Sequence, residues 1–217
     1  MSSQRNPQPG DGDGSVKAPN RRLIRKQQTR DRVLAAARRL LSVAGYEGAT
    51  IRDIAAEAGM STGAIFVNFK DKSQLFREII FADMAALTAS MRDAADGGRG
   101  VEDALLRAFS TGYAFYKSQL PLARAAFCVS WLPDEGVELR FSTAAKALRE
   151  LITEQVQFAV ERGELSQEAE VKLRGDMLFD AYLANYPEAI FLGWSLEALQ
   201  AKARDQIRVI LAGARRG

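Results

Sequence analysis

The groups that could carry acid–base chemistry in this sequence are carboxylates, lysine or tyrosine, because histidine is absent and Cys128 is the only cysteine. Asp176 and Asp180 lie four residues apart, one turn of a helix, where two carboxylates can share a proton. Neither a glycine-rich phosphate loop nor a cluster with metal-ligand spacing accompanies them. Without histidine, an enzyme would also lack the usual general base and metal ligand. An enzyme is therefore the weaker hypothesis, and we expect no cofactor and no metal.

Residues 50–72 indicate a different kind of site, because they predict two short helices joined by a tight turn. Asp53 follows Thr50 at the spacing of a helix cap. Gly59 can take the left-handed conformation that ends a helix, and Ser61 can cap the next one. The apolar positions share one face of each helix: Ile51, Ile54, Ala55 and Ala58, then Ile65 and Phe69.

Two helices this short cannot bury a core alone, so they must pack against a neighbour. The amphipathic segment from about Thr29 to Ala44 supplies it, with Val33, Leu34, Ala37, Leu40 and Leu41 on one stripe. The arrangement is a helix-turn-helix, whose second helix enters the major groove of DNA.

The segment from Val33 to about Phe76 resembles the TetR family of transcriptional regulators. The similarity includes Ala44-Gly45-Tyr46, the run from Thr50 to Ser61, and the run from Thr62 to Lys72. Beyond it, the chain resembles the family only in being long and helical. The resemblance implies an all-α fold of about nine helices, with an N-terminal three-helix DNA-binding domain before a larger ligand-binding and dimerisation domain.

The resemblance also implies the residues that contact DNA. Thr50 and Lys72 would contact phosphates, and Arg52 a phosphate or a base edge. Thr62 would face bases, while Ser61 and the backbone of Gly63 approach phosphates. Two further positions depart from the family pattern: Phe66 replaces a usual tyrosine and cannot donate a phenolic hydrogen bond, and Asn68 replaces a usual histidine.

Positive charge is concentrated in the same part of the chain. Residues 1–72 contain 13 Lys or Arg against 7 Asp or Glu, whereas the rest contains 17 against 20. Clustered basic residues favour a polyanionic partner such as double-stranded DNA. We expect residues 1–28 to form a disordered basic arm, residues 29–74 the DNA-binding domain, and residues 75–217 the effector-binding and dimerisation domain.

The second domain is predicted to be helical throughout. A connector helix begins after Asp71 and runs to about Ala95. Five more helices are expected at about 101–117, 121–131, 137–162, 168–193 and 196–212, with a kink at Pro187. Residues 168–212, the last two helices, carry apolar stripes suited to a homodimer on a palindromic operator.

Aromatic residues concentrate in the middle helices, and pockets lined this way bind apolar or aromatic small molecules. The residues predicted to bind such an effector are Tyr113, Tyr116, Arg124, Phe127, Trp131, Phe141, Asp176 and Asp180. Aromatic residues at helical spacing also form ordinary core, so both interpretations stay open. The effector would release the protein, a repressor, from its operator.

One alternative is a DNA-binding protein that needs no effector and acts through protein contacts on its acidic part.

No apolar run is long enough to span a membrane, and the polar N-terminus has no secretory signal. We therefore expect a cytoplasmic location and no membrane partner.

Overall fold

Ten helices and no strand make up the described part of the chain, which confirms the predicted all-α fold. The computed structural model describes residues 21–129 and 135–214, without the side chains of Arg22 and of residues 125–144. The helices are α1 (Arg21–Gly48), α2 (Ile51–Glu57), α3 (Thr62–Phe66), α4 (Lys72–Asp96), α5 (Val101–Ser118), α6 (Leu120–Val129), α7 (Glu135–Glu161), α8 (Val171–Ala184), α9 (Tyr186–Ile190) and α10 (Leu196–Ala212).

The first helix is longer than predicted. It begins at Arg21 rather than at about Thr29, so the last part of the predicted basic arm is helical, while residues 1–20 lie outside the described residues. Arg, Lys, Leu and Gln, which dominate this segment, all favour helices. The side chain of Gln27 also donates to Asp31 Oδ1 at 2.7 Å. The regular helix ends at Gly45, whose φ of 69° separates it from a last turn through Gly48.

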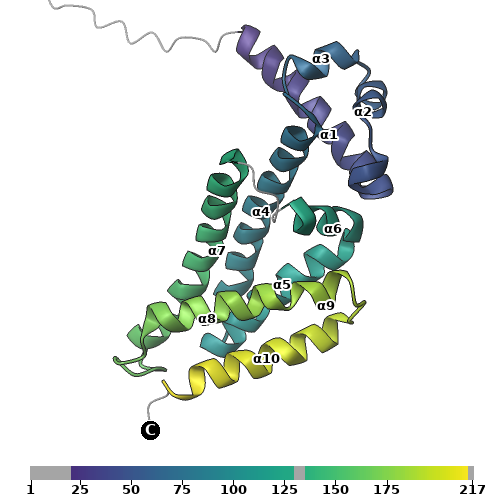
Figure 1. Ribbon diagram of the computed structural model, residues 1–217. Coiled ribbons are helices and arrows are strands. Elements are labelled where there is room, and N and C mark those ends of the chain that lie inside the picture. Colours follow the sequence, from purple (N-terminus) through teal and green to yellow (C-terminus); the bar gives the residue numbers. More distant parts are fainter. Residues whose placement is uncertain (1–20, 130–134, 215–217) are drawn as a thin grey trace, which may run out of the picture.

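The N-terminal helices share one apolar core. Val33 and Leu41 of α1, Ile54 of α2, Ile65 of α3 and Phe76 of α4 are all fully buried in it. Because α2 and α3 each span two turns or fewer, this shared burial rather than helix propensity keeps them folded. At the top of Figure 1, α1, α2 and α3 accordingly form a small unit from which α4 extends.

The second core is built mainly from α4, α5, α7, α8 and α10. Its fully buried members include Met91, Leu105, Ile152, Leu178 and Ile207, one from each of these helices. In Figure 1, α8 and α10 lie side by side across the front of this lower half, and α4 and α7 run along each other behind them.

The predicted penultimate helix is divided into two. α8 ends at Ala184 and α9 begins at Tyr186, with Pro187 in its first turn, where the missing N–H has no helical partner to lose. α8 also begins later than predicted, at Val171, because Glu170 has a left-handed conformation with φ 47°.

The two cores meet at α4 and α6. α4 contributes Leu75 to Ile80 to the first core and Leu87 to Ala95 to the second. Leu122 of α6 is buried in the first core, whereas the next residue, Ala123, belongs to the second. Both helices therefore connect the N-terminal unit to the larger one.

Candidate DNA interface and inter-helix cavity

The turn between α2 and α3 is defined by side-chain caps on both helices. Thr50 Oγ1 accepts the Asp53 N–H at 3.1 Å, and Ser61 Oγ accepts the Ala64 N–H at 3.3 Å. Between them, Gly59 has φ 64°, which a residue with a side chain would adopt only at a cost. Arg32 of α1 donates to the Ala58 carbonyl at 2.7 Å and so attaches the turn to the first helix.

This geometry leaves the start of α3 open to solvent. Ile65 and Phe69 point into the core and are 1 % exposed, whereas Ser61, Thr62 and Gly63 are exposed. Thr50 and Arg52 of the preceding helix are exposed as well. A β-carbon added to Gly63 would meet nothing closer than 3.9 Å, so the backbone at Gly63 is open to close approach by a partner molecule.

The end of α3 differs from its start. Phe66 and Val67 are 54 % and 79 % exposed, so this part of the surface is apolar. Asn68 is half-buried, and its amide Nδ2 donates to the Ala64 carbonyl at 3.0 Å. The side-chain N–H groups of Asn68 are therefore partly committed within the chain.

Lys72 lies at the first position of α4, next to the end of the α3 segment. Its Nζ is 4.3 Å from the centre of the Tyr46 ring, a cation–π distance. Tyr46 in turn packs on Phe76 with 4.8 Å between ring centres, and its hydroxyl lies 2.8 Å from Ser73 Oγ. The ammonium is thus held at the surface by an aromatic platform rather than by an acidic partner.

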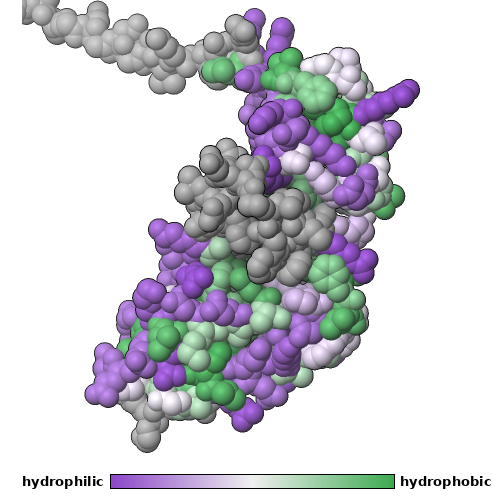
Figure 2. Space-filling model, viewed as in Figure 1, coloured by the Kyte–Doolittle hydropathy of each residue, from purple (hydrophilic) through white to green (hydrophobic). Residues whose placement is uncertain are grey.

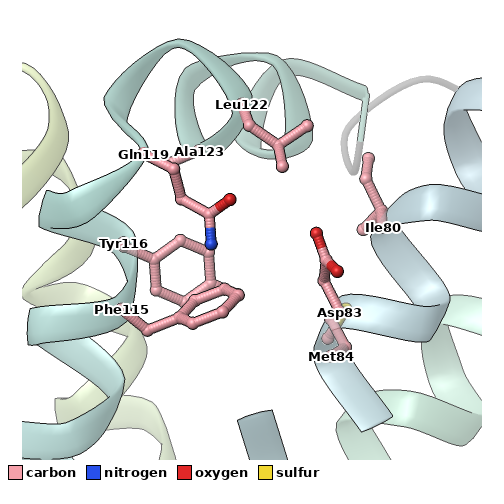
Figure 3. Close-up of a pocket in the computed structure, with 8 residues that line it drawn as sticks. All are labelled: Ile80, Asp83, Met84, Phe115, Tyr116, Gln119, Leu122 and Ala123. Carbon is pink, nitrogen blue, oxygen red and sulfur yellow. The ribbon is translucent and has the colours of Figure 1, made fainter. Parts of the chain in front are cut away.

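A small cavity lies where α4, α5 and α6 meet. It is lined by Ile80, Asp83, Met84, Phe115, Tyr116, Gln119, Leu122 and Ala123 (Figure 3). Its volume of about 20 Å³ suffices for roughly one water molecule. A larger ligand would need the side chains around it to move.

Asp83 is the charged residue of this cavity. It is 9 % exposed and forms an ion pair with Arg38 of α1. Burial raises the pKa of its carboxyl above the ordinary 3.8, and the hydrogen bond and charge of Arg38 oppose the rise without cancelling it. Sequence reasoning missed this residue, although its position gave a signal: Asp83 stands on the apolar stripe of α4, four residues after Ile79 and four before Leu87.

Comparison with known proteins bears on the helix-turn-helix. Residues 33–79 match the model described as "Bacterial regulatory proteins, tetR family", and this range contains α2, α3 and the start of α4. Residues 33–79 therefore form a helix-turn-helix segment of the TetR family. The residues that carried the sequence resemblance, Val33 to about Phe76, lie within the matched range.

The TetR relatives share mainly this N-terminal unit. The repressor AcnR of Corynebacterium efficiens is 38 % identical over 65 residues, which cover 30 % of this chain and 35 % of AcnR. The regulator AcrR of Shigella flexneri is 47 % identical over 53 residues, covering 24 % and 25 % of the two chains. The matched part of this chain therefore spans about a third or less of the length of AcnR and AcrR. The regulator UidR of Escherichia coli is 24 % identical over 155 residues, covering 71 % and 78 %.

Solved structures extend the similarity to the whole fold. FadR from Bacillus subtilis, crystallised with stearoyl-CoA, has a TM-score of 0.69 at 16 % identity and covers 85 % of this chain and 99 % of its own. The TetR-family regulator PfmR from Thermus thermophilus has a TM-score of 0.60 at 21 % identity, covering 86 % and 100 %. The relatives by sequence are transcriptional regulators, which supports the prediction that the chain is not an enzyme.

Within this TetR fold, the predicted effector residues are dispersed. Of the eight, Tyr116 lines the cavity. Tyr113 is fully buried beside it, where its hydroxyl accepts a hydrogen bond from Asn185 Nδ2 at 2.9 Å. Arg124 donates to the Ile190 carbonyl at 3.2 Å. Trp131 lies outside the described residues, as do the side chains of Phe127 and Phe141.

Asp176 and Asp180, the two carboxylates one helical turn apart, do not line the cavity. Asp176 is bound at the surface by Arg149 at 2.6 Å and by Lys172 at 2.8 Å. The hydrogen bonds from Lys172 and Arg149 lower the pKa of Asp176. Asp180 is exposed. The structure thus pairs Asp176 with cations and shows no hydrogen bond between the two acids among the described residues.

The last helices of the TetR fold present a second apolar surface. Leu178, Leu199 and Ile207 are fully buried in the chain's own core. Others remain outside: Leu173 and Met177 of α8 are 52 % and 45 % exposed, and Val209 of α10 is 67 % exposed. Figure 2 shows hydrophobic residues among hydrophilic ones over this lower half of the molecule.

The described part of the chain contains no group of three or more His, Cys, Asp or Glu side chains arranged to hold a metal ion. Within the same residues, no helix is both long and apolar enough to cross a membrane.

Proposed function

We propose that this chain is a DNA-binding transcriptional repressor that binds a palindromic operator as a homodimer and is released by a small apolar or aromatic effector. Residues 29–74 would be the DNA-binding domain, residues 75–217 the effector-binding and dimerisation domain, and the protein would act in the cytoplasm. The observation that carries the proposal is the exposed polar edge of α3 at Ser61, Thr62 and Gly63, next to a basic first helix.

The geometry of this edge suits a major groove. Hydroxyl groups at the N-terminus of a helix can meet base edges, and the free N–H groups there attract phosphates. Thr50, Arg52 and Lys72 would contact phosphates on either side. The apolar end of α3 at Phe66 suits contact with thymine methyl groups or with sugars rather than a hydrogen bond to phosphate. Asn68 would contact DNA through the amide N–H that does not bind the Ala64 carbonyl.

Selection from a pool of random duplexes tests the DNA proposal. We expect enrichment of a two-fold symmetric sequence with half-sites about one helical turn apart. Affinity for it should fall steeply with salt, because each neutralised phosphate releases counterions. If the full chain retains no duplex even at low ionic strength, the proposal is wrong.

The exposed apolar surface of α8 and α10 supports the homodimer. Leu173 and Met177 lie four residues apart and so face the same side of α8. Buried against a second copy, the same surface forms an isologous two-fold interface. A dimer of this kind presents two copies of α3, which matches the symmetry of a palindrome.

The cavity between α4, α5 and α6 supports effector release. α4 begins beside the DNA-binding edge, and Leu122 of α6 packs into the N-terminal core. A ligand that displaced these helices would therefore disturb the N-terminal unit, with a coupling free energy of about 1–3 kcal/mol. FadR, of similar fold, was crystallised with stearoyl-CoA, so a fold of this kind holds a ligand with a long apolar chain.

The effector-independent alternative is favoured by the small volume of the same cavity, about 20 Å³. Thermal-shift screening of apolar and aromatic compounds separates effector release from this alternative, because a ligand that binds only the folded state raises the melting temperature. A compound that raises it and weakens operator binding supports release by an effector. Stabilising compounds that leave operator affinity unchanged would favour the alternative.

A further inference from the structure

Asp83, which lines the cavity between α4, α5 and α6, has one carboxylate oxygen without a partner among the described residues. Asp83 Oδ1 is paired with Arg38, but Oδ2 is inaccessible to solvent and accepts no hydrogen bond within the described part of the chain. A buried carboxylate oxygen left without a donor costs free energy. The position therefore favours any group that brings N–H donors and positive charge to Oδ2.

The walls opposite Asp83 are suited to such a group. In Figure 3, the carboxylate of Asp83 faces the Gln119 side chain and the rings of Phe115 and Tyr116 across the cavity. Aromatic rings attract cations, and an amide oxygen can accept one further ammonium N–H. Burial and the charge of Asp83 raise the pKa of Tyr116 to about 12, despite a hydrogen bond with Tyr186. The volume of about 20 Å³ is right for a single ammonium head.

Arg38, the present partner of Asp83, is the more exposed member of the ion pair. The side chain of Arg38 is 42 % exposed, whereas that of Asp83 is 12 % exposed. If the ion pair separated, the guanidinium would be hydrated at little cost, but the carboxylate would be left buried and unpaired. A ligand cation that reached Asp83 would remove that penalty, so exchange of one cation for another is the favourable route.

We propose that Asp83 anchors an effector that carries a protonated amine, whose ammonium group occupies the cavity and replaces Arg38 as the partner of the carboxylate. The apolar part of the effector would contact Phe115, Leu122 and Met84. This inference rests on the proposed function, since it names the chemical class of the effector. It also supplies a mechanism: Arg38 belongs to α1 and Asp83 to α4, so the exchange removes an ion pair that joins the two helices.

Three probes of matched shape test the anchor by calorimetry at pH 7 on the full chain: 2-phenylethylamine, 2-phenylethanol and phenylacetate. We expect the amine to bind at least about tenfold more tightly than the alcohol, and phenylacetate most weakly, because Asp83 repels it. Equal binding of amine and alcohol, or no detectable amine binding, would overturn the proposal.

Two substitutions should act in opposite directions. Asp83→Asn is expected to remove the preference for the amine over the alcohol. Arg38→Gln removes the competing internal cation and should strengthen amine binding severalfold without changing alcohol binding. Arg39→Gln is the matched control, because Arg39 makes an exposed ion pair with Glu57 at 2.8 Å and does not line the cavity. If Asp83→Asn does not fold, the Arg38→Gln titration decides alone, and an unchanged amine affinity contradicts the proposal.

A DNA measurement separates this inference from the proposed function. On a duplex selected from the random pool, the amine should weaken binding of the natural chain about fivefold or more, and should have no such effect on Asp83→Asn. A chain that binds no duplex would refute the DNA-binding proposal, while the amine titration would still decide the anchor. Amine binding that leaves DNA affinity unchanged would overturn the exchange mechanism.

Discussion

Thr62 and Lys72 contact different parts of the DNA in the proposed complex. Thr62 is exposed at the first position of α3, whereas Lys72 is held over the Tyr46 ring at the start of α4. We expect Thr62→Ala to reduce discrimination at one base position by about 1–3 kcal/mol. Lys72→Ala should instead weaken binding to every sequence alike and lower the salt slope by about one. Binding to a panel of single-base operator variants at several salt concentrations measures both effects.

Thr111→Ala provides the control for these substitutions. Thr111 belongs to α5, far from α3, and its hydroxyl donates to the Arg107 carbonyl at 3.0 Å within its own helix. It should change neither the base preference nor the salt slope. A Thr62→Ala protein with unaltered preference at every position would show that the start of α3 does not read bases.

Glu164 makes stability dependent on pH. Its Oε2 accepts the Val101 N–H at 2.8 Å at the start of α5, and its Oε1 accepts Arg162 Nε at 2.7 Å. Burial alone would raise the pKa of Glu164, but Arg162 and the Val101 N–H outweigh it and lower the pKa below the ordinary 4.5. The stabilisation is therefore fully present above pH 4.5 and is lost as the pH falls through the folded-state pKa.

We expect Glu164→Gln to lower the free energy of unfolding by about 1 kcal/mol at pH 7, as for loss of a helix cap. Urea unfolding of both proteins between pH 7 and pH 3 measures the difference, which should shrink toward the acid end. Glu161→Gln is the control, since Glu161 is exposed and accepts a hydrogen bond only from Gln157, at 3.0 Å, among the described contacts. If the difference in unfolding free energy between the two proteins grew on acidification, the pKa of Glu164 would not be lowered by folding.

At the level of elements, the contact between α5 and α8 depends on a glycine. A β-carbon at Gly112 would lie 1.9 Å from the hydroxyl oxygen of Tyr182, which is fully buried and accepts a hydrogen bond from Tyr186 at 2.5 Å. Alanine would gain about 1 kcal/mol of helix propensity but would displace the buried Tyr182 side chain from the surface of α5. We expect Gly112→Ala to lower the free energy of unfolding by about 1–3 kcal/mol in urea titrations.

Gly97→Ala is the matched control for this packing. Gly97 ends α4 with φ −80°, and a β-carbon there would meet nothing closer than 3.7 Å. Its effect should stay within about 0.5 kcal/mol. Should Gly112→Ala prove as harmless as Gly97→Ala, the close contact of Tyr182 with the α5 backbone is not a constraint on stability.

The elements that sequence predicted best are those with local signals. Thr50 and Ser61 each cap the helix expected to follow them, because a cap is a contact across three residues. The start of α8 was predicted too early, since the left-handed conformation of Glu170 has no local sequence signal.

Of the two candidate sites, the DNA-binding surface could be predicted from local sequence signals and the cavity could not. The exposed start of α3 follows from the spacing of Ile65 and Phe69 and from the cap at Ser61. The cavity does not, because Asp83, Tyr116 and Leu122 come from three helices whose contacts depend on the tertiary fold. Asp176 shows that a local spacing can also mislead. Its spacing to Asp180 suggested a carboxylate pair, whereas Arg149, 27 residues away in sequence, binds Asp176 instead.

For the whole molecule, the N-terminal unit and the proposed dimer surface lie at opposite ends. The unit is at the top of Figure 1, and α8 and α10 cross the lower half. α4 extends from the first to the second, so the arrangement of the second domain decides where α3 is placed. In a dimer formed through α8 and α10, the separation of the two α3 helices would depend on the angle of α4. Small displacements at the cavity would then be enlarged at the DNA.

The dimer surface itself gives the last prediction. Met177→Glu places a charge where Leu173, Met177 and Val209 would be buried, and an unpaired charge buried in an interface costs several kcal/mol. We expect a dimer in the natural chain, a monomer in the variant by analytical ultracentrifugation, and a loss of operator affinity of at least about 100-fold, because linking two half-site contacts raises affinity by that order. Val43→Glu, at an 87 % exposed position on α1, should leave the dimer intact. If Met177→Glu remained dimeric, and Leu173→Glu as well, the two copies must join through another surface, and the α3 separation inferred from α8 and α10 would no longer hold.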